Sequence, residues 1–122
     1  MFHDLIKFKE LVKSSNWCYL NKKVPFRTLD NLGWDNQQVE NVLCALTDRD
    51  FQKIVPNCRV TEFLGCEFVD AAQYEIYWNE VSNTRQDAWS KEIISLSLKI
   101  AVVTDDEGQA AGLVTFHLSG GM

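Results

Sequence analysis

Four side chains beyond residue 50 have the chemistry needed to hold and cleave a phosphodiester. Lys53, Arg59 and Lys99 are positively charged at neutral pH, and such groups bind phosphate and stabilise the charge that develops as a phosphodiester breaks. Histidine side chains commonly act as general acids or bases near neutral pH, and His117 offers such a group. We interpret Lys53 and His117 as catalytic candidates, and Arg59 and Lys99 as substrate-binding candidates. The alternative is that all four are ordinary charges on a solvated sheet face.

Aromatic residues offer a second kind of site. Tyr74, Tyr77 and Trp78 fall close together, and Trp89 follows in a polar stretch. If one face of this segment is exposed, its rings form a surface that holds a protein or a small ligand. Packing of the same rings in the hydrophobic core is the alternative.

Motifs of known cofactor and metal sites are missing from the sequence. It has no phosphate-binding glycine loop, dinucleotide fingerprint, calcium loop or zinc motif. Two histidines and four cysteines without C-x-x-C spacing are too few for a set of converging metal ligands. We therefore expect no metal and no cofactor. The cysteines are expected as free thiols, with a Cys58–Cys66 disulfide as the alternative.

The clearest structural pattern is a long antiparallel hairpin over residues 92–118. From Ile94 onward apolar and polar residues alternate, and a helix would scatter this period of two around its circumference. Turn residues occupy positions 105–108, and the return strand alternates again. Lys99 and His117 both fall outside the apolar set on paired strands. We therefore expect them to share one face of the sheet.

Helical patterns come first along the chain and strand patterns follow. The expected helices cover residues 4–14, 25–32, 35–46 and a short segment from 47 that holds Phe51 and Ile54; the expected strands cover 17–20, 59–64, 66–69, 74–81 and the two arms of the hairpin, with a polar loop at 82–90. This order predicts an α+β fold in one domain over residues 1–122, with N-terminal helices packed on a C-terminal antiparallel β-sheet. Edge strands at 17–20 or 59–64 offer a way to form a homodimer.

The charge of the chain bears on its partners. Twelve basic and 17 acidic residues give a net charge of −5, so any binding of nucleic acid has to use a local basic cluster. The first 30 residues are mildly basic, whereas the rest of the chain is acidic. No apolar run is long enough to span a bilayer, and the N-terminus lacks the pattern of a secretory signal. These features predict a cytoplasmic protein with no membrane partner.

Several short motifs, covering about half the chain, resemble the MqsR-type toxins of bacterial toxin–antitoxin pairs. The motifs are His-Asp-Leu at 3–5, Asn-Leu-Gly at 31–33, the helix containing Val39, Val42 and Leu46, Asp-Phe-Gln-Lys at 50–53, Leu-Lys-Ile at 98–100 and Val-Thr-Phe at 114–116. The resemblance implies a RelE-like fold and a cognate antitoxin protein as partner. It also implies that the protein is either an mRNA-cleaving endoribonuclease or a degenerate relative of one. It also places Lys53 at the position of the family's lysine. The alternative is a non-enzymatic binding module that uses the aromatic face.

Overall fold

The computed structural model describes residues 2–21, 23–63 and 67–118. Within these residues the chain forms three α-helices, one short 3-10 helix and six strands. The helices are α1 (Leu5–Lys13), α2 (Lys23–Leu32), α3 (Asn36–Ala45) and the 3-10 helix η1 (Asp48–Asp50); the strands are β1 (Trp17–Tyr19), β2 (Phe51–Arg59), β3 (Phe68–Asn79), β4 (Thr84–Gln86), β5 (Ile94–Asp105) and β6 (Gly108–Leu118). This inventory confirms the predicted α+β class.

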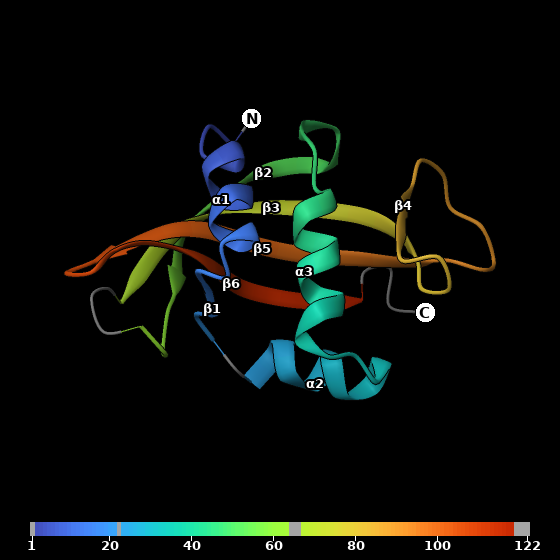
Figure 1. Cartoon of the computed structure of the whole chain (residues 1–122), viewed down its shortest axis with the longest axis horizontal. Coiled ribbons are helices and arrows are strands. Elements are labelled where there is room, and N and C mark those ends of the chain that lie inside the picture. The colour runs from blue at the N-terminus through green and yellow to red at the C-terminus, as the bar shows by residue number, and fades with distance from the viewer. Residues whose placement is uncertain (1, 22, 64–66, 119–122) are drawn as a thin grey trace.

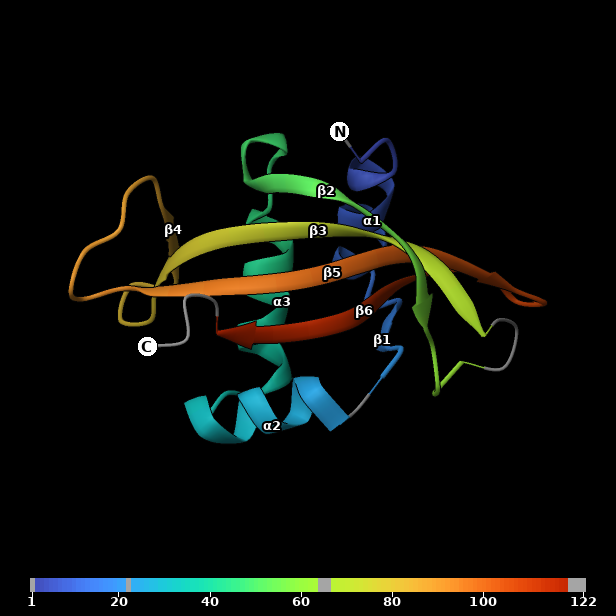
Figure 2. The ribbon, with the colours of Figure 1, turned by 180° about the vertical axis from the view of Figure 1, so that it is seen from behind.

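The strands form one sheet in the order β1-β6-β5-β3-β2. Strand β4 also pairs with β3, on the same side of β3 as β2. All neighbouring strands are antiparallel except β1, which runs parallel to β6. The sheet is therefore mixed at one edge, where an entirely antiparallel sheet was predicted. Helices α1 and α3 lie across one face, and α2 lies along the β6 edge (Figure 1). From behind, the strands lie in front of the helices (Figure 2).

The main hydrophobic core lies between the helices and the sheet. Alternate residues of β3 and β5 enter it, because successive strand side chains point to opposite faces. The strand residues in this core include Tyr74, Ile76, Trp78, Leu96, Leu98, Ile100 and Phe116, and they pack against Phe8, Val39, Val42 and Leu43 of the helices. The polar residues between them are thereby directed to the opposite, helix-free side of the sheet.

A smaller apolar cluster covers one end of that opposite side. It contains Leu20, Val60, Ala71, Val103 and Val114. The chain segments that carry it are held together by Asn21, whose amide donates to the backbone oxygen of Arg59 at 2.9 Å and accepts from the backbone N–H of Thr61 at 3.0 Å. The end of the sheet nearer β4 lies outside this cluster.

Local signals set several helix ends as predicted. Asp35 and Gln38 form a complete capping box at the start of α3. Gly33 follows α2 with φ 70°, a left-handed conformation that glycine adopts without steric cost. The hairpin is also confirmed, since β5 pairs with β6 from Leu96 to Asp105 across a two-residue turn.

Other boundaries differ from the prediction. The expected helix from residue 47 is a single 3-10 turn, and Phe51 already begins β2. Strand β2 ends at Arg59, so residues 60–63 of the predicted 59–64 strand are not a strand. Residues 68–69 and 74–79 of the predicted 66–69 and 74–81 strands belong to one strand, β3, and the predicted loop at 82–90 contains β4.

Two further predictions are not tested by the described residues. The alternative Cys58–Cys66 disulfide involves residue 66, which lies outside them. The dimer edge proposed at 17–20 corresponds to β1, which is an edge strand of the sheet. A homodimer stays a prediction.

Candidate functional site

The strand register places three of the four predicted site residues on the helix-free side of the sheet. Lys53 pairs with Gln73, Gln73 with Lys99, and Lys99 with Thr115, so these side chains form one row across four strands. The next row contains Glu75, Ser97 and His117. Beyond it, the next residue of β3 on this side is Tyr77. We call this surface the helix-free face; it consists of Lys53, Gln73, Glu75, Tyr77, Ser97, Lys99, Thr115 and His117.

The spacing of the rows brings the charged groups within reach of one substrate. Lys99 and His117 are diagonal neighbours on paired strands, which separates their backbones by roughly 7 Å. Lys53 lies two strands from Lys99, at about 10 Å between backbones. Both lysines have flexible four-carbon stems, so their ammonium groups can converge on a phosphate between them. The prediction that Lys99 and His117 share a face is therefore confirmed.

Irregularities in the ladder adjoin both lysines. The register shifts between Phe51 and Lys53, and again between Lys99 and Ile100. A β-bulge adds one residue to a strand and redirects the side chains beside it. At the first shift the extra residue is Gln52, which is thereby directed to the same side as Glu75. Two bulges so close to the charged rows shape the helix-free face locally.

The imidazole of His117 contacts the backbone of the next residue. Its Nδ1 lies 3.2 Å from the backbone oxygen of Leu118. Because a carbonyl oxygen only accepts hydrogen bonds, Nδ1 carries the proton in this contact and Nε2 bears the lone pair of the neutral ring. His117 is half-buried beside the buried hydroxyl side chain of Ser97, which is 4% exposed.

Arg59 lies apart from the two rows. It pairs with Phe68 beyond a second register shift in β2 and is exposed. Its side chain lines a cleft of about 250 Å³ together with Lys23, Asn21, Thr61, Val114 and Thr115. Thr115 is also the β6 partner of Lys99, so this cleft adjoins the helix-free face at the end opposite Tyr77. The structure thus places Arg59 at the margin of the candidate site.

The proposed aromatic ligand face does not form as predicted. Tyr74 and Trp78 are 0% and 1% exposed and point into the main core. Tyr77 lies between them on the strand and therefore points to the helix-free side, where it is 37% exposed. Trp89 is 62% exposed in the loop after β4. Strand alternation separates Tyr77 from Tyr74 and Trp78, and Trp89 lies in a different segment, so only Tyr77 contributes to a surface shared with other candidate residues.

A polar cleft opens beside Tyr77 where the edge of β3 changes partner. Along this edge of β3, strand β2 pairs with residues up to Tyr74, and β4 pairs with residues from Tyr77 onward. Glu75 lies in the gap between the two partner strands. The cleft has a volume of about 220 Å³ and is lined by Arg49, Asp50, Gln52, Glu75, Tyr77, Arg85, Gln86 and Asp87. It continues the row that contains His117.

Arg85 of this cleft is bound by two carboxylates. Arg85 binds Asp50 through two nitrogens, with Nη2 to Oδ1 at 2.7 Å and Nε to Oδ2 at 3.0 Å, and its Nη1 binds Asp87 at 2.7 Å. These hydrogen bonds, with Asp50 first, raise the pKa of Arg85 above its ordinary value, so it stays charged. Asp50 also accepts from the backbone and hydroxyl of Thr47. The pair ties η1 to β4 and forms the base of the cleft.

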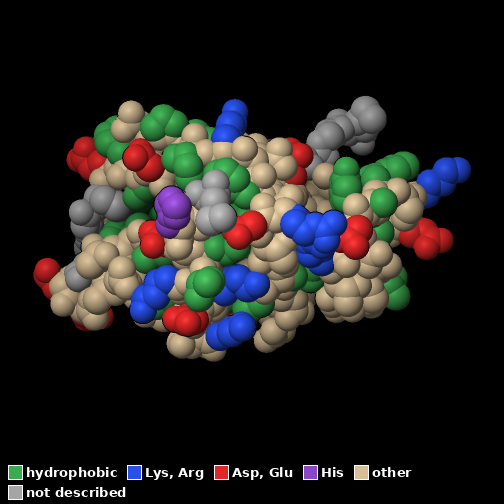
Figure 3. All heavy atoms as spheres, turned by 90° about the horizontal axis from the view of Figure 1, so that it is seen from above, with side chains coloured by type: hydrophobic (Ala, Val, Ile, Leu, Met, Phe, Trp, Pro, Cys, Tyr) green, Lys and Arg blue, Asp and Glu red, His purple; other side chains and the backbone are tan. Residues whose placement is uncertain are grey.

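The charges of the helix-free face are not cancelled by close partners. Within the described residues, neither Lys53 nor Lys99 has a carboxylate within 4.0 Å, and Glu75 forms no ion pair. Elsewhere on the molecule the charges are mixed: seen from the β2 edge, basic and acidic side chains are interspersed (Figure 3). The two lysines therefore act as a local positive field on an acidic protein.

Glu75 is the site residue that is missing from the candidates predicted from the sequence. The alternation of residues 74–78 carries the signal, since it directs Glu75 and Tyr77 away from the buried Tyr74, Ile76 and Trp78. The order of strands in the sheet, which places Glu75 in one row with Ser97 and His117, is not visible in that pattern.

Comparison of the chain with protein-family models, with curated proteins and with solved structures gave no match. Among the described residues, no group of three or more histidine, cysteine or acidic side chains is arranged to hold a metal ion. None of the helices that these residues form has both the length and the apolar composition needed to cross a bilayer.

Proposed function

We propose that this protein is an endoribonuclease that binds single-stranded RNA across the helix-free face. The observation that carries the proposal is the shared register of Lys53, Lys99 and His117, two ammonium groups and an imidazole on one side of one sheet. RNA carries its own nucleophile, the 2′-hydroxyl, so the protein has only to move protons and stabilise charge.

The reaction uses each group once. The 2′-oxygen attacks the adjacent phosphorus while its proton passes to Nε2 of His117, and Lys99 stabilises the charge on the phosphoryl oxygens. The bond from phosphorus to the 5′-oxygen of the next nucleotide breaks, and that oxygen takes a proton from the ammonium group of Lys53. The products are a 2′,3′-cyclic phosphate and a 5′-hydroxyl. Proton exchange with water then returns His117 and Lys53 to their starting states.

The resemblance to MqsR-type toxins supports the same activity, since it implies mRNA cleavage and places Lys53 at the family's lysine. On that basis a RelE-like scaffold, a cognate antitoxin as protein partner and a cytoplasmic location belong to the proposal. Arg59, at the margin of the face, is a binding residue for an adjoining phosphate. The binding-module alternative loses support because Tyr74 and Trp78 are buried.

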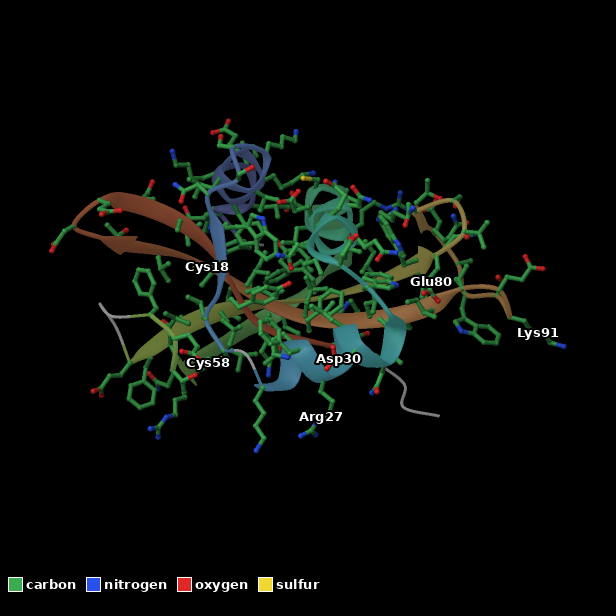
Figure 4. The ribbon with its side chains drawn as sticks, turned by 60° about the horizontal axis from the view of Figure 1, so that its bottom comes forward. Cys18, Arg27, Asp30, Cys58, Glu80 and Lys91 are labelled. Carbon is green, nitrogen blue, oxygen red and sulfur yellow. The ribbon has the colours of Figure 1, made fainter. Side chains whose placement is uncertain are left out.

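Purified protein incubated with a single-stranded RNA tests the proposal. We expect cleavage that leaves cyclic phosphate and 5′-hydroxyl ends, and a loss of rate of about 100-fold or more in His117→Ala, because general acid–base catalysis contributes that much. Lys53→Ala should also slow cleavage. The control is Lys91→Ala, an exposed lysine in the loop before β5 (Figure 4). Equal RNA loss in all four proteins would identify a contaminant, and intact RNA with the unmodified protein would overturn the proposal.

A further inference from the structure

Some side chains that line the polar cleft beside Tyr77 form no contacts that stabilise the fold. Arg85 is bound by Asp50 and Asp87 and completes the scaffold. Glu75, Gln52 and the Tyr77 hydroxyl, by contrast, form no hydrogen bond or ion pair with the described residues. A carboxylate, an amide and an exposed ring therefore line the same opening of about 220 Å³ without partners of their own.

The arrangement of these groups fits a planar ligand with a polar edge. Tyr77 is 37% exposed and lies on the strand two residues from Glu75, so the carboxylate and the ring lie side by side on one face. Single-stranded RNA bases stack on aromatic side chains and form hydrogen bonds through their Watson–Crick edges. A base stacked on Tyr77 would present that edge to Glu75.

We propose that this cleft is a nucleobase subsite that selects guanine. An ionised carboxylate only accepts hydrogen bonds, and its two oxygens match two adjacent donors. Guanine offers such a pair in its N1–H and N2 amino group. Adenine and cytosine each present one amino donor beside an acceptor, and uracil presents one N–H between two oxygens. Only guanine satisfies both oxygens of Glu75 without placing an acceptor against them.

The position of the cleft connects it to the proposed reaction, and in this respect the inference rests on the proposed function. Glu75, Ser97 and His117 lie in one row across three neighbouring strands. Glu75 and His117 are two strand spacings apart, about 10 Å between backbones. A guanine held at Glu75 therefore places its own or a neighbouring phosphate between His117 and the lysines, and cleavage should occur next to guanine.

Binding of short 2′-deoxy oligonucleotides tests the subsite separately from cleavage. These lack the attacking hydroxyl, so a pentamer of deoxyuridine with a central guanine, hypoxanthine, adenine or uracil binds without being cut. By fluorescence anisotropy we expect the guanine pentamer to bind at least fivefold more tightly than the adenine or uracil pentamer. A side chain that forms two hydrogen bonds to one base favours that base over others by at least this factor. Hypoxanthine lacks the amino group and should fall between them.

Two variants and one control assign the effect. Glu75→Gln should remove the guanine preference and leave the affinity for the uracil pentamer within about twofold. Tyr77→Leu should weaken binding of all four pentamers about fivefold or more, because stacking does not depend on the base. Glu92→Gln, an exposed carboxylate in the loop before β5, is the matched control and should behave as the unmodified protein.

The outcomes distinguish the two proposals. Equal affinity for all pentamers, or an unchanged guanine preference in Glu75→Gln, overturns the subsite whether or not RNA is cleaved. A guanine preference that Glu75→Gln abolishes, in a protein that leaves RNA intact, supports the subsite and overturns the nuclease. Cleavage at all bases alike, dependent on His117, supports the nuclease alone.

Discussion

At the scale of single residues, the partly buried Tyr19 links a pKa shift to the stability of the fold. Its hydroxyl donates to Oδ1 of Asn36 at 2.7 Å. Burial, and to a smaller extent the carboxylate of Glu40, raise the pKa of Tyr19 from 10.0 to about 12. The folded state therefore favours the neutral phenol. Its contribution to the free energy of unfolding is complete below pH 10 and is lost as the pH rises from 10 to 12, because the unfolded chain ionises first.

Denaturant unfolding at several pH values between 8 and 12 measures this loss. Tyr19→Phe should make the midpoint less dependent on pH above 10, while Tyr77→Phe, on the exposed helix-free face, serves as the control. Burial also raises the pKa of Tyr74, so some pH dependence persists in the Tyr19 variant. An unchanged pH profile in Tyr19→Phe would contradict the assignment.

The same scale shows what a residue pattern can predict of the site. Period-two alternation directs Lys99 and His117 away from Leu98 and Phe116, and their shared face follows from the sequence alone. For Lys53 the sequence indicated the vicinity of a short helix, and only its pairing with Gln73 brings it onto the face. Such pairing joins residues 20 or more positions apart, which local periodicity does not encode.

At the scale of elements, the Arg85–Asp50 pair joins η1 to β4 and should contribute strongly to stability. Asp50 is 6% exposed and accepts bonds from both Arg85 and Thr47. Arg85→Ala leaves this carboxylate buried without its cation, which costs about 3 kcal/mol. Arg49→Ala is the control: Arg49 contacts Asp87 at 3.9 Å, both are largely exposed, and its loss should cost less than about 1 kcal/mol. Equal unfolding midpoints for the two variants would contradict this ranking.

The contact of β1 with β6 gives a second test at this scale. A Cβ added at Gly112 would lie 2.5 Å from Cδ1 of Leu20, which is fully buried in the smaller apolar cluster. Gly112→Ala should therefore cost about 1–3 kcal/mol through overpacking. In Leu20→Ala the space is vacated, so the double variant should be more stable than the sum of the two single losses predicts. Additive losses in a denaturant-melt cycle would exclude the contact.

The elements also show where sequence patterns stop being sufficient. Thr47 and Asp50 do form a capping box where the helix from residue 47 was predicted to begin, but this helix is a single 3-10 turn. Ile54 and Val55 favour a strand, and Pro56 is tolerated because β2 is an edge strand with a register shift at that point. Start signals are local, whereas the continuation of β2 depends on pairing with β3.

At the scale of the whole molecule, the proposed function requires RNA to approach a protein with a net charge of −5. Long-range attraction is therefore weak, and binding depends on the few cations of the helix-free face and its margin, Lys53, Lys99 and Arg59. Each phosphate neutralised on a single strand contributes about 0.7 to the slope of log affinity against log salt. We expect a shallow slope of roughly 2 for an uncleavable deoxy oligonucleotide, far below that of a basic nucleic-acid-binding domain. Lys99→Ala should lower the slope by about 0.7 and Lys91→Ala should leave it unchanged, in anisotropy titrations at increasing salt. A slope that is the same in both variants would show that the nucleic acid binds elsewhere on the molecule.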